Sequence, residues 1–132
     1  MASATVRMLP TTLTAILDNR IKKGEVIAVA RVAGIQAAKK CSELIPLCHP
    51  MPLDKVTILL EPIDSQRLGI TCECRVTHKT GVEMEALTGV SVAALTIYDM
   101  CKAIDKGISI ENTQLIKKIG GKSGEWVNQE TA

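Results

Sequence analysis

A carboxylate and an amine near the end of an apolar helix are the clearest candidates for chemistry in this 132-residue sequence. Asp99 follows a stretch, 84–98, in which almost every residue is small or apolar, and Lys102 comes three residues later. On a helix this spacing places both side chains on one face, close enough to pair. Such a pair can shift the pKa of each partner, as acid–base catalysis requires. The spacing also suits a structural ion pair at a helix end, so the pattern leaves both interpretations open.

A second candidate is the segment 44–50, in which two prolines flank a thiol and an imidazole. Pro50 favours an extended conformation for His49, so Cys48 and His49 lie in a stiff loop of the kind that often binds ligands. The alternative is that the prolines only end the preceding helix. A nucleophilic Cys48–His49 pair is disfavoured, because adjacent side chains seldom point at each other.

Residues 120–124 read Gly-Gly-Lys-Ser-Gly and resemble a phosphate-binding loop. A Walker A motif would need glycine where Ile116 stands and a long helix after the serine, so this is not a P-loop. The glycines can still form an anion-binding cradle of backbone N–H groups, with Lys117 and Lys118 beside Lys122. A frayed basic tail is the alternative.

The cysteines raise the question of a metal. Cys72, Cys74 and His78 share one parity of a predicted strand, and Cys48 and His49 could add ligands. However, the chain has no C-x-x-C pair, and free cysteine on an apolar face behaves as a small hydrophobe. We therefore expect no metal and no disulfide.

These candidates must be positioned by a small set of predicted elements. Residues 67–77 alternate between apolar and polar side chains, the period of a strand with one face buried. The remaining patterns predict strands over 25–32, 55–61 and within 108–119, and helices over 13–19 (capped by Thr11 or Thr12), 35–44 and 83–104. The order from residue 25 is β-α-β-β-α-β. It predicts an α+β, ferredoxin-like fold: an antiparallel sheet with helices on one face.

Composition narrows the class of protein. The chain is 46% hydrophobic and 23% charged with a net charge of +2, which predicts one globular domain over 1–132 and gives no reason to expect nucleic-acid or membrane partners. No apolar run is long enough for a bilayer and no signal peptide begins the chain, so we expect a cytoplasmic protein. An RNA-recognition module of this topology would need aromatic stacking residues, and the predicted strands contain none. The uncovered face of the sheet predicts contact with another subunit.

Four motifs together resemble the MoaC family, the cyclic pyranopterin monophosphate synthases of molybdenum cofactor biosynthesis. They are Leu-Cys-His-Pro at 47–50, Lys-Thr-Gly-Val-Glu-Met-Glu-Ala-Leu-Thr at 79–88, Ser-Val-Ala-Ala-Leu-Thr-Ile-Tyr-Asp-Met-Cys-Lys at 91–102 and Gly-Gly-Lys-Ser-Gly at 120–124. The segment 33–39 also looks like the helix of that family. The resemblance runs from about residue 11 to 124, and it implies that a further N-terminal segment of the family is absent.

The resemblance implies conversion of 3′,8-cyclo-7,8-dihydroguanosine 5′-triphosphate to cyclic pyranopterin monophosphate, with release of pyrophosphate and without a cofactor. It makes Asp99 the catalytic acid/base and Lys102 its partner in proton transfer. It further implies a homohexamer, a trimer of dimers with sites between subunits. The implied substrate-binding residues are Leu47, Cys48, His49, Met84, Glu85, Lys23, Lys118 and Lys122. A non-catalytic nucleotide-binding regulatory module of the same fold is the alternative.

Overall fold

The computed structural model describes residues 1–77, 81–120 and 124–129 of the chain. One layer is a four-stranded sheet with strand order β2-β3-β1-β4, in which every neighbouring pair is antiparallel. The strands are β1 (Ala2–Arg7), β2 (Lys55–Pro62), β3 (Arg67–Arg75) and β4 (Ser109–Leu115). Two short strands, β5 (Lys117–Lys118) and β6 (Trp126–Val127), pair separately.

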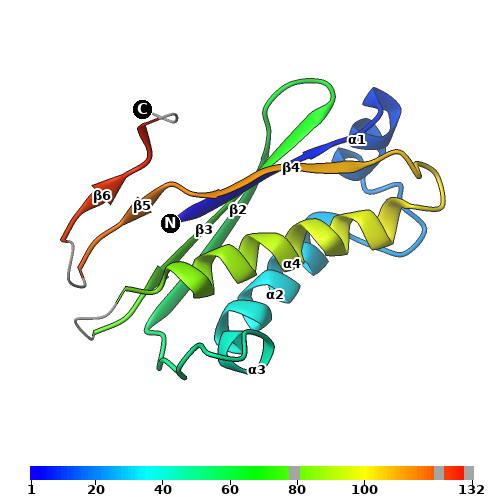
Figure 1. Cartoon of the computed structure of the whole chain (residues 1–132). Coiled ribbons are helices and arrows are strands. Elements are labelled where there is room, and N and C mark those ends of the chain that lie inside the picture. The colour runs from blue at the N-terminus through cyan, green and yellow to red at the C-terminus, as the bar shows by residue number, and fades with distance from the viewer. Residues whose placement is uncertain (78–80, 121–123, 130–132) are drawn as a thin grey trace.

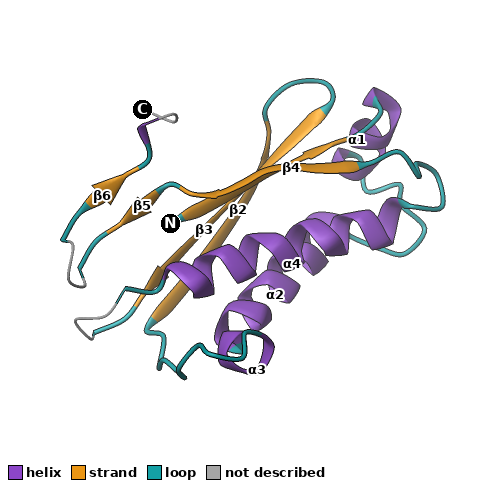
Figure 2. Ribbon diagram, in the orientation of Figure 1, coloured by secondary structure: helices purple, strands orange, loops and turns teal. Residues whose placement is uncertain are grey.

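The second layer is helical. Its two long helices pack against each other and cover one face of the sheet (Figures 1 and 2). The helices are α1 (Pro10–Leu17), α2 (Val26–Lys39), α3 (Cys41–Leu44) and α4 (Glu83–Cys101). The predicted α+β class is therefore confirmed, as are the strand over 55–61 and the helix that begins at residue 83.

The core between the layers is aliphatic, in keeping with a chain that has one tyrosine, one tryptophan and no phenylalanine. On β3, Leu68, Ile70 and Cys72 are fully buried, and Cys74 is nearly so. The intervening polar side chains lie on the other face of the sheet. The alternation over this strand is thus confirmed, although pairing ends at Arg75 rather than at residue 77.

The strand predicted over 25–32 is wrong: these residues begin α2, which runs on without a break through Gly34 to Lys39. Val and Ile favoured a strand there, but packing against α4 overrides this weak preference. The buried residues of α2 recur at helical spacing, at positions 26, 30, 34, 37 and 38. That period was present in the sequence, and the β-branched side chains masked it.

The first strand of the sheet is instead β1, a segment to which no strand was assigned. Ala2, Ala4 and Val6 are buried while Ser3 and Thr5 are half-buried, which is the alternation of a strand. The pattern was weak in the sequence because alanine carries little hydrophobic signal. β1 lies between β3 and β4 and so occupies the middle of the sheet.

The two long helices approach closely at a pair of glycines. A Cβ on Gly34 would meet the side chain of Ile58 and lie 2.8 Å from the carbonyl oxygen of Gly89. A Cβ on Gly89 would lie 2.8 Å from the Sγ of Cys72. Glycine at these two positions therefore sets how closely α2 and α4 pack, and so the position of the whole of α4 over the sheet.

The start of α1 is stabilised from a distance and not by a threonine cap. Its N-cap residue is Leu9, which has no side-chain cap. A carboxylate oxygen of Asp105 instead accepts hydrogen bonds from Leu9 N and from the hydroxyl of Thr12, both at 2.9 Å. Asp105 is only 6% exposed, and its other oxygen accepts a bond from Gly107 N. The predicted capping role of Thr11 or Thr12 was wrong, because Thr12 is a donor to this buried carboxylate.

We expect Asp105→Ala to lower the free energy of unfolding by about 2–3 kcal/mol, because it leaves the buried Thr12 hydroxyl and the partly buried Leu9 N–H without their acceptor. Asp105→Asn keeps an acceptor of nearly the same shape and should cost clearly less. Urea denaturation followed by circular dichroism measures both. Equal losses in the two variants would contradict this role.

The open face of the sheet carries polar side chains, among them Ser3, Thr5, Thr71 and Glu73, all half-buried. Leu59, which pairs with Thr71 on this face, is an apolar exception and is 50% exposed. Further exposed apolar side chains lie on the helices, where Val29, Val32 and Leu95 are 44–58% exposed. Within the described ranges, no helix combines the length and apolar character needed to cross a bilayer.

Candidate functional site

Asp99 and Lys102 meet at the C-terminal end of α4, as their spacing predicted. Lys102 Nζ lies 3.0 Å from Asp99 Oδ1. A third group joins them: Lys23, in the turn between α1 and α2, lies with its Nζ 3.3 Å from Asp99 Oδ2 and donates to the Asp99 carbonyl oxygen at 3.2 Å. The buried Ile97 and Cys101 hold this turn of α4 on the core. The carboxylate is therefore fixed on the outside of the molecule between two ammonium groups.

The two lysines change the proton affinity of this carboxylate. The hydrogen bond from Lys102, then the one from Lys23, together with the positive charges of both, hold the pKa of Asp99 below its usual value. Asp99 is thus ionised at neutral pH and stays so into more acid solution than an isolated carboxylate would. Because all three side chains are about half exposed, their attraction contributes little to stability. A depressed pKa suits a base, or an anchor for lysines, better than an initial proton donor.

A second group of side chains lies at the other end of α4. Cys41 begins α3, Cys48 lies in the loop after it, and Glu85 stands in the first turn of α4. The two Sγ atoms are 3.8 Å apart, and Cys48 Sγ lies 3.7 Å from Glu85 Oε2. Burial, together with the neighbouring Cys41 and Glu85, raises the pKa of the Cys48 thiol to about 11. The free thiol is therefore a poor nucleophile at neutral pH.

Of the substrate-binding residues predicted near this end, only Cys48 and Glu85 are brought together. Leu47 is 93% exposed and His49 is also exposed, so neither belongs to the thiol–carboxylate group. Met84 is 36% exposed beside Glu85. Cys41 was missed, and its only sequence signal was a second cysteine seven residues before Cys48.

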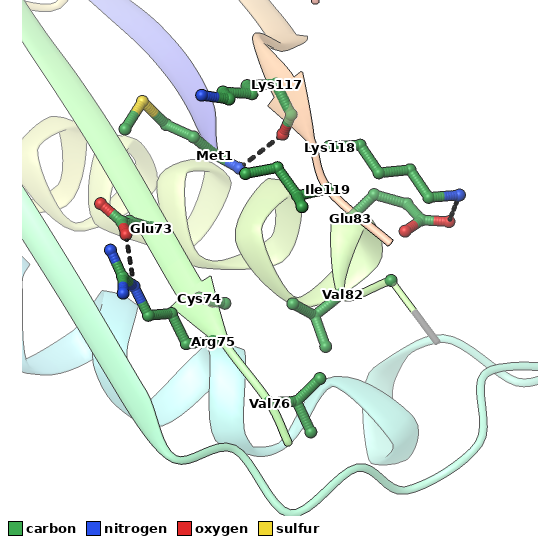
Figure 3. Close-up of a pocket in the computed structure, with 11 residues that line it drawn as sticks. Met1, Glu73, Cys74, Arg75, Val76, Val82, Glu83, Lys117, Lys118 and Ile119 are labelled. Carbon is green, nitrogen blue, oxygen red and sulfur yellow. Dashed lines mark hydrogen bonds and ion pairs between the residues drawn. The ribbon is translucent and has the colours of Figure 1, made fainter. Parts of the chain in front are cut away.

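A pocket of about 500 Å³ opens between the start of α4 and the short strand β5 (Figure 3). Lys118 extends across it towards Glu83, with Nζ 3.5 Å from Oε1, and the other Glu83 oxygen is buried without a partner among the described residues. Arg75 and Lys117 add positive charge to the wall and are paired with Glu73 and Glu125. The full lining is Met1, Glu73, Cys74, Arg75, Val76, Gly81, Val82, Glu83, Lys117, Lys118 and Ile119.

Two predicted features fall partly outside the described residues. Lys122 and most of the 120–124 loop lie in the gap 121–123, and His78 lies in the gap 78–80. Cys72 and Cys74 are buried under the sheet with Sγ atoms 3.8 Å apart, as members of the core. The described part of the chain therefore gives no support to a metal site formed by Cys72, Cys74 and His78.

The two ends of α4 are too far apart for their groups to act on the same small molecule within a single chain. Glu85 and Asp99 are 14 positions apart on α4, which is about 21 Å along the axis at about 1.5 Å per residue. Groups that act on one small molecule must lie within a few ångströms of it. One chain therefore presents two separate candidate sites, called half-sites below: the thiol–carboxylate group with its neighbouring cationic pocket, and the Asp99 group with its two lysines.

Comparison with known protein families identifies the family of this chain. The model of the MoaC family matches residues 1–121 of the 132-residue chain. The match covers the sheet, all four helices and both half-sites. The chain therefore belongs to the MoaC family, which acts in the biosynthesis of the molybdenum cofactor.

Proposed function

We propose that this member of the MoaC family is a cyclic pyranopterin monophosphate synthase. It converts 3′,8-cyclo-7,8-dihydroguanosine 5′-triphosphate to cyclic pyranopterin monophosphate and releases pyrophosphate, as a phosphorus–oxygen lyase in the cytoplasm. The observation that carries the proposal is the Asp99 carboxylate held between Lys23 and Lys102 at 3.0–3.3 Å. Family membership supports the pathway and a substrate derived from GTP.

The reaction needs proton transfer at two places. Rearrangement of the ring system moves protons between carbon, nitrogen and oxygen atoms. Formation of a cyclic monophosphate from a triphosphate requires a substrate hydroxyl to attack the α-phosphorus while pyrophosphate leaves. In this mechanism the ionised Asp99 takes up a proton and Lys102 donates one. The charge of Lys23 and Lys102 stabilises negative charge as it develops on the substrate.

Several cations are available for the triphosphate. We assign Lys118, Lys122 and Lys23 to phosphate binding, and Leu47, Cys48, His49, Met84 and Glu85 to the walls of the ring site. The cationic side chains along the pocket of Figure 3 support the assignment of Lys118. The position of Glu85 and Cys48 at the same end of α4 supports the second.

We infer that the active site is completed by a second subunit, in a homohexamer built as a trimer of dimers. The two half-sites of one chain lie about 21 Å apart along α4, and two copies can bring opposite ends together. The exposed Val29, Val32 and Leu95 give the helical layer apolar surface for such contacts. The strand order β2-β3-β1-β4, with helices between β1 and β2 and between β3 and β4, supports a ferredoxin-like topology for each subunit.

The direct test is to incubate the purified protein with the cyclised nucleotide and to measure pyrophosphate and pterin. We expect both products in equal amounts, without added metal or redox cofactor. Binding of the nucleotide without product would favour the non-catalytic regulatory module instead.

We expect Lys118→Ala to weaken nucleotide binding, because it removes a cation from the wall of the pocket. The loss should shrink as salt rises, but less than for a fully exposed lysine, because the Lys118 side chain is 24% exposed and partly buried charges are screened less. Isothermal titration at low and high salt measures this. The matched control is Arg67→Ala, at the far end of β3, where the arginine pairs with Asp64 at 3.5 Å. Equal affinity in Lys118→Ala and the unmodified protein at low salt would remove Lys118 from the binding site.

A further inference from the structure

The thiol–carboxylate group has the composition of a metal site that the sequence did not reveal. The ligand atoms of Cys41, Cys48 and Glu85 all lie within 4.8 Å of one another. They come from three separate segments of the chain: the start of α3, the loop that follows it and the first turn of α4. Cys41 and Glu85 are buried and Cys48 is half-buried, so the group opens to solvent on one side only.

Two of the three spacings in this group match a tetrahedral zinc ion, and the third, between Cys41 Sγ and the Glu85 carboxylate, is within 4.8 Å. With Zn–S bonds of about 2.3 Å, tetrahedral geometry places two sulfur ligands about 3.8 Å apart, and the Sγ atoms of Cys41 and Cys48 are 3.8 Å apart. A carboxylate oxygen at about 2.0–2.2 Å from zinc would lie about 3.5 Å from a sulfur ligand. The distance from Cys48 Sγ to Glu85 Oε2 is 3.7 Å.

The buried Glu85 carboxylate would be stabilised by a bound cation. Glu85 is 4% exposed, and among the described residues no lysine, arginine or histidine lies within ion-pair distance of it. A buried carboxylate without a cationic partner is costly, and its contact with a thiol compensates little of that cost. Thr88 stands 3.4 Å from Cys41 Sγ and can orient this sulfur from behind.

We propose that Cys41, Cys48 and Glu85 bind one zinc ion and leave its fourth position open to water or another ligand. Binding converts both thiols to thiolates and releases their two protons to solvent, so affinity should rise with pH. This departs from the sequence-based expectation of no metal, because Cys41 and Glu85 lie far apart in sequence and only the fold brings them together. Cys48 and Glu85 also belong to the proposed ring site, so the ion would lie at its wall. Metal affinity is measured without the nucleotide, so its outcome is separate from that of the proposed reaction.

The test is metal affinity, measured on the full chain kept reduced with a non-thiol reductant. A chromophoric zinc indicator competes for the ion and gives stoichiometry and Kd. We expect one zinc per chain, and the cobalt-substituted protein should show the intense visible absorption of a tetrahedral site with thiolate ligands. Cys41→Ser should weaken zinc binding at least about 100-fold, since loss of mere outer-shell partners already costs about 10–100-fold.

Two further variants keep the test decisive. Cys48→Ser should weaken zinc binding as well. Because Cys48 is only half-buried, this variant serves as the test if Cys41→Ser does not fold. Cys101→Ser is the matched control, because Cys101 is a buried cysteine with no place in the group. The proposal is overturned if zinc binds below one ion per chain, or if Cys101→Ser weakens binding as much as Cys41→Ser and Cys48→Ser do.

Discussion

Asp99→Asn and Lys102→Ala should each lower kcat by about 10²–10⁴-fold, the usual contribution of a positioned acid–base group. The physical reason is that each variant removes one end of a 3.0 Å contact between a base and a proton donor. Fold should survive, because both side chains are more than half exposed at the last turn of α4. The double variant should be little worse than either single variant, since groups that act as a unit are not additive.

The pH profile distinguishes catalysis from a merely structural pair. The Lys102 contact is the largest cause of the lowered pKa of Asp99. Without Lys102 this pKa rises, so the acid limb of kcat/KM should move to higher pH in Lys102→Ala. Asp64→Asn is the matched control, because Asp64 and Arg67 form another exposed i,i+3 pair at 3.5 Å. Near-normal turnover in folded Lys102→Ala would remove the pair from the mechanism.

The sequence predicted those features that depend only on neighbouring residues. The pairing of Asp99 with Lys102 follows from helical spacing alone. The alternation on β3 follows from the two faces of a strand. Both were therefore readable from a few neighbouring residues. The Asp99 pair also needed no knowledge of the rest of the fold, because the two side chains lie on one helix.

Features that tertiary packing decides were missed. Residues 26–32 are, apart from Arg31, β-branched or small, which masked the helical spacing of the buried residues of α2, and packing against α4 decides for the helix. Lys23 approaches Asp99 across 76 positions of sequence, and Cys41 approaches Glu85 across 44. No periodicity encodes such contacts. The resemblance to a family did name Lys23, Cys48 and Glu85, but it gave no indication of Cys41.

Mixed oligomers should show whether the two half-sites come from different subunits. Asp99→Asn and Glu85→Gln chains should each be nearly inactive alone, because each disables one half-site. The two chains are co-expressed with different tags and purified through both tags. A site shared between two subunits takes one half from each, and each half is intact in about one case in two. Roughly a quarter of the wild-type activity should therefore return. A site contained in one chain would recover nothing, since no single chain carries both intact groups.

The control for this experiment is a mixture of Asp99→Asn with Lys102→Ala. These residues lie 3.0 Å apart on one helix of one chain, so every site takes both from the same subunit. Mixing them should therefore restore no activity, even if the assembly exchanges subunits freely. Light scattering of the same samples checks that each mixture is an oligomer. Recovery in the control mixture as well would show that the gain comes from something other than shared sites. If the first mixture is a confirmed oligomer and recovers no activity, the whole site lies within one chain. The distance of about 21 Å between Glu85 and Asp99 along α4 would then not require a second subunit.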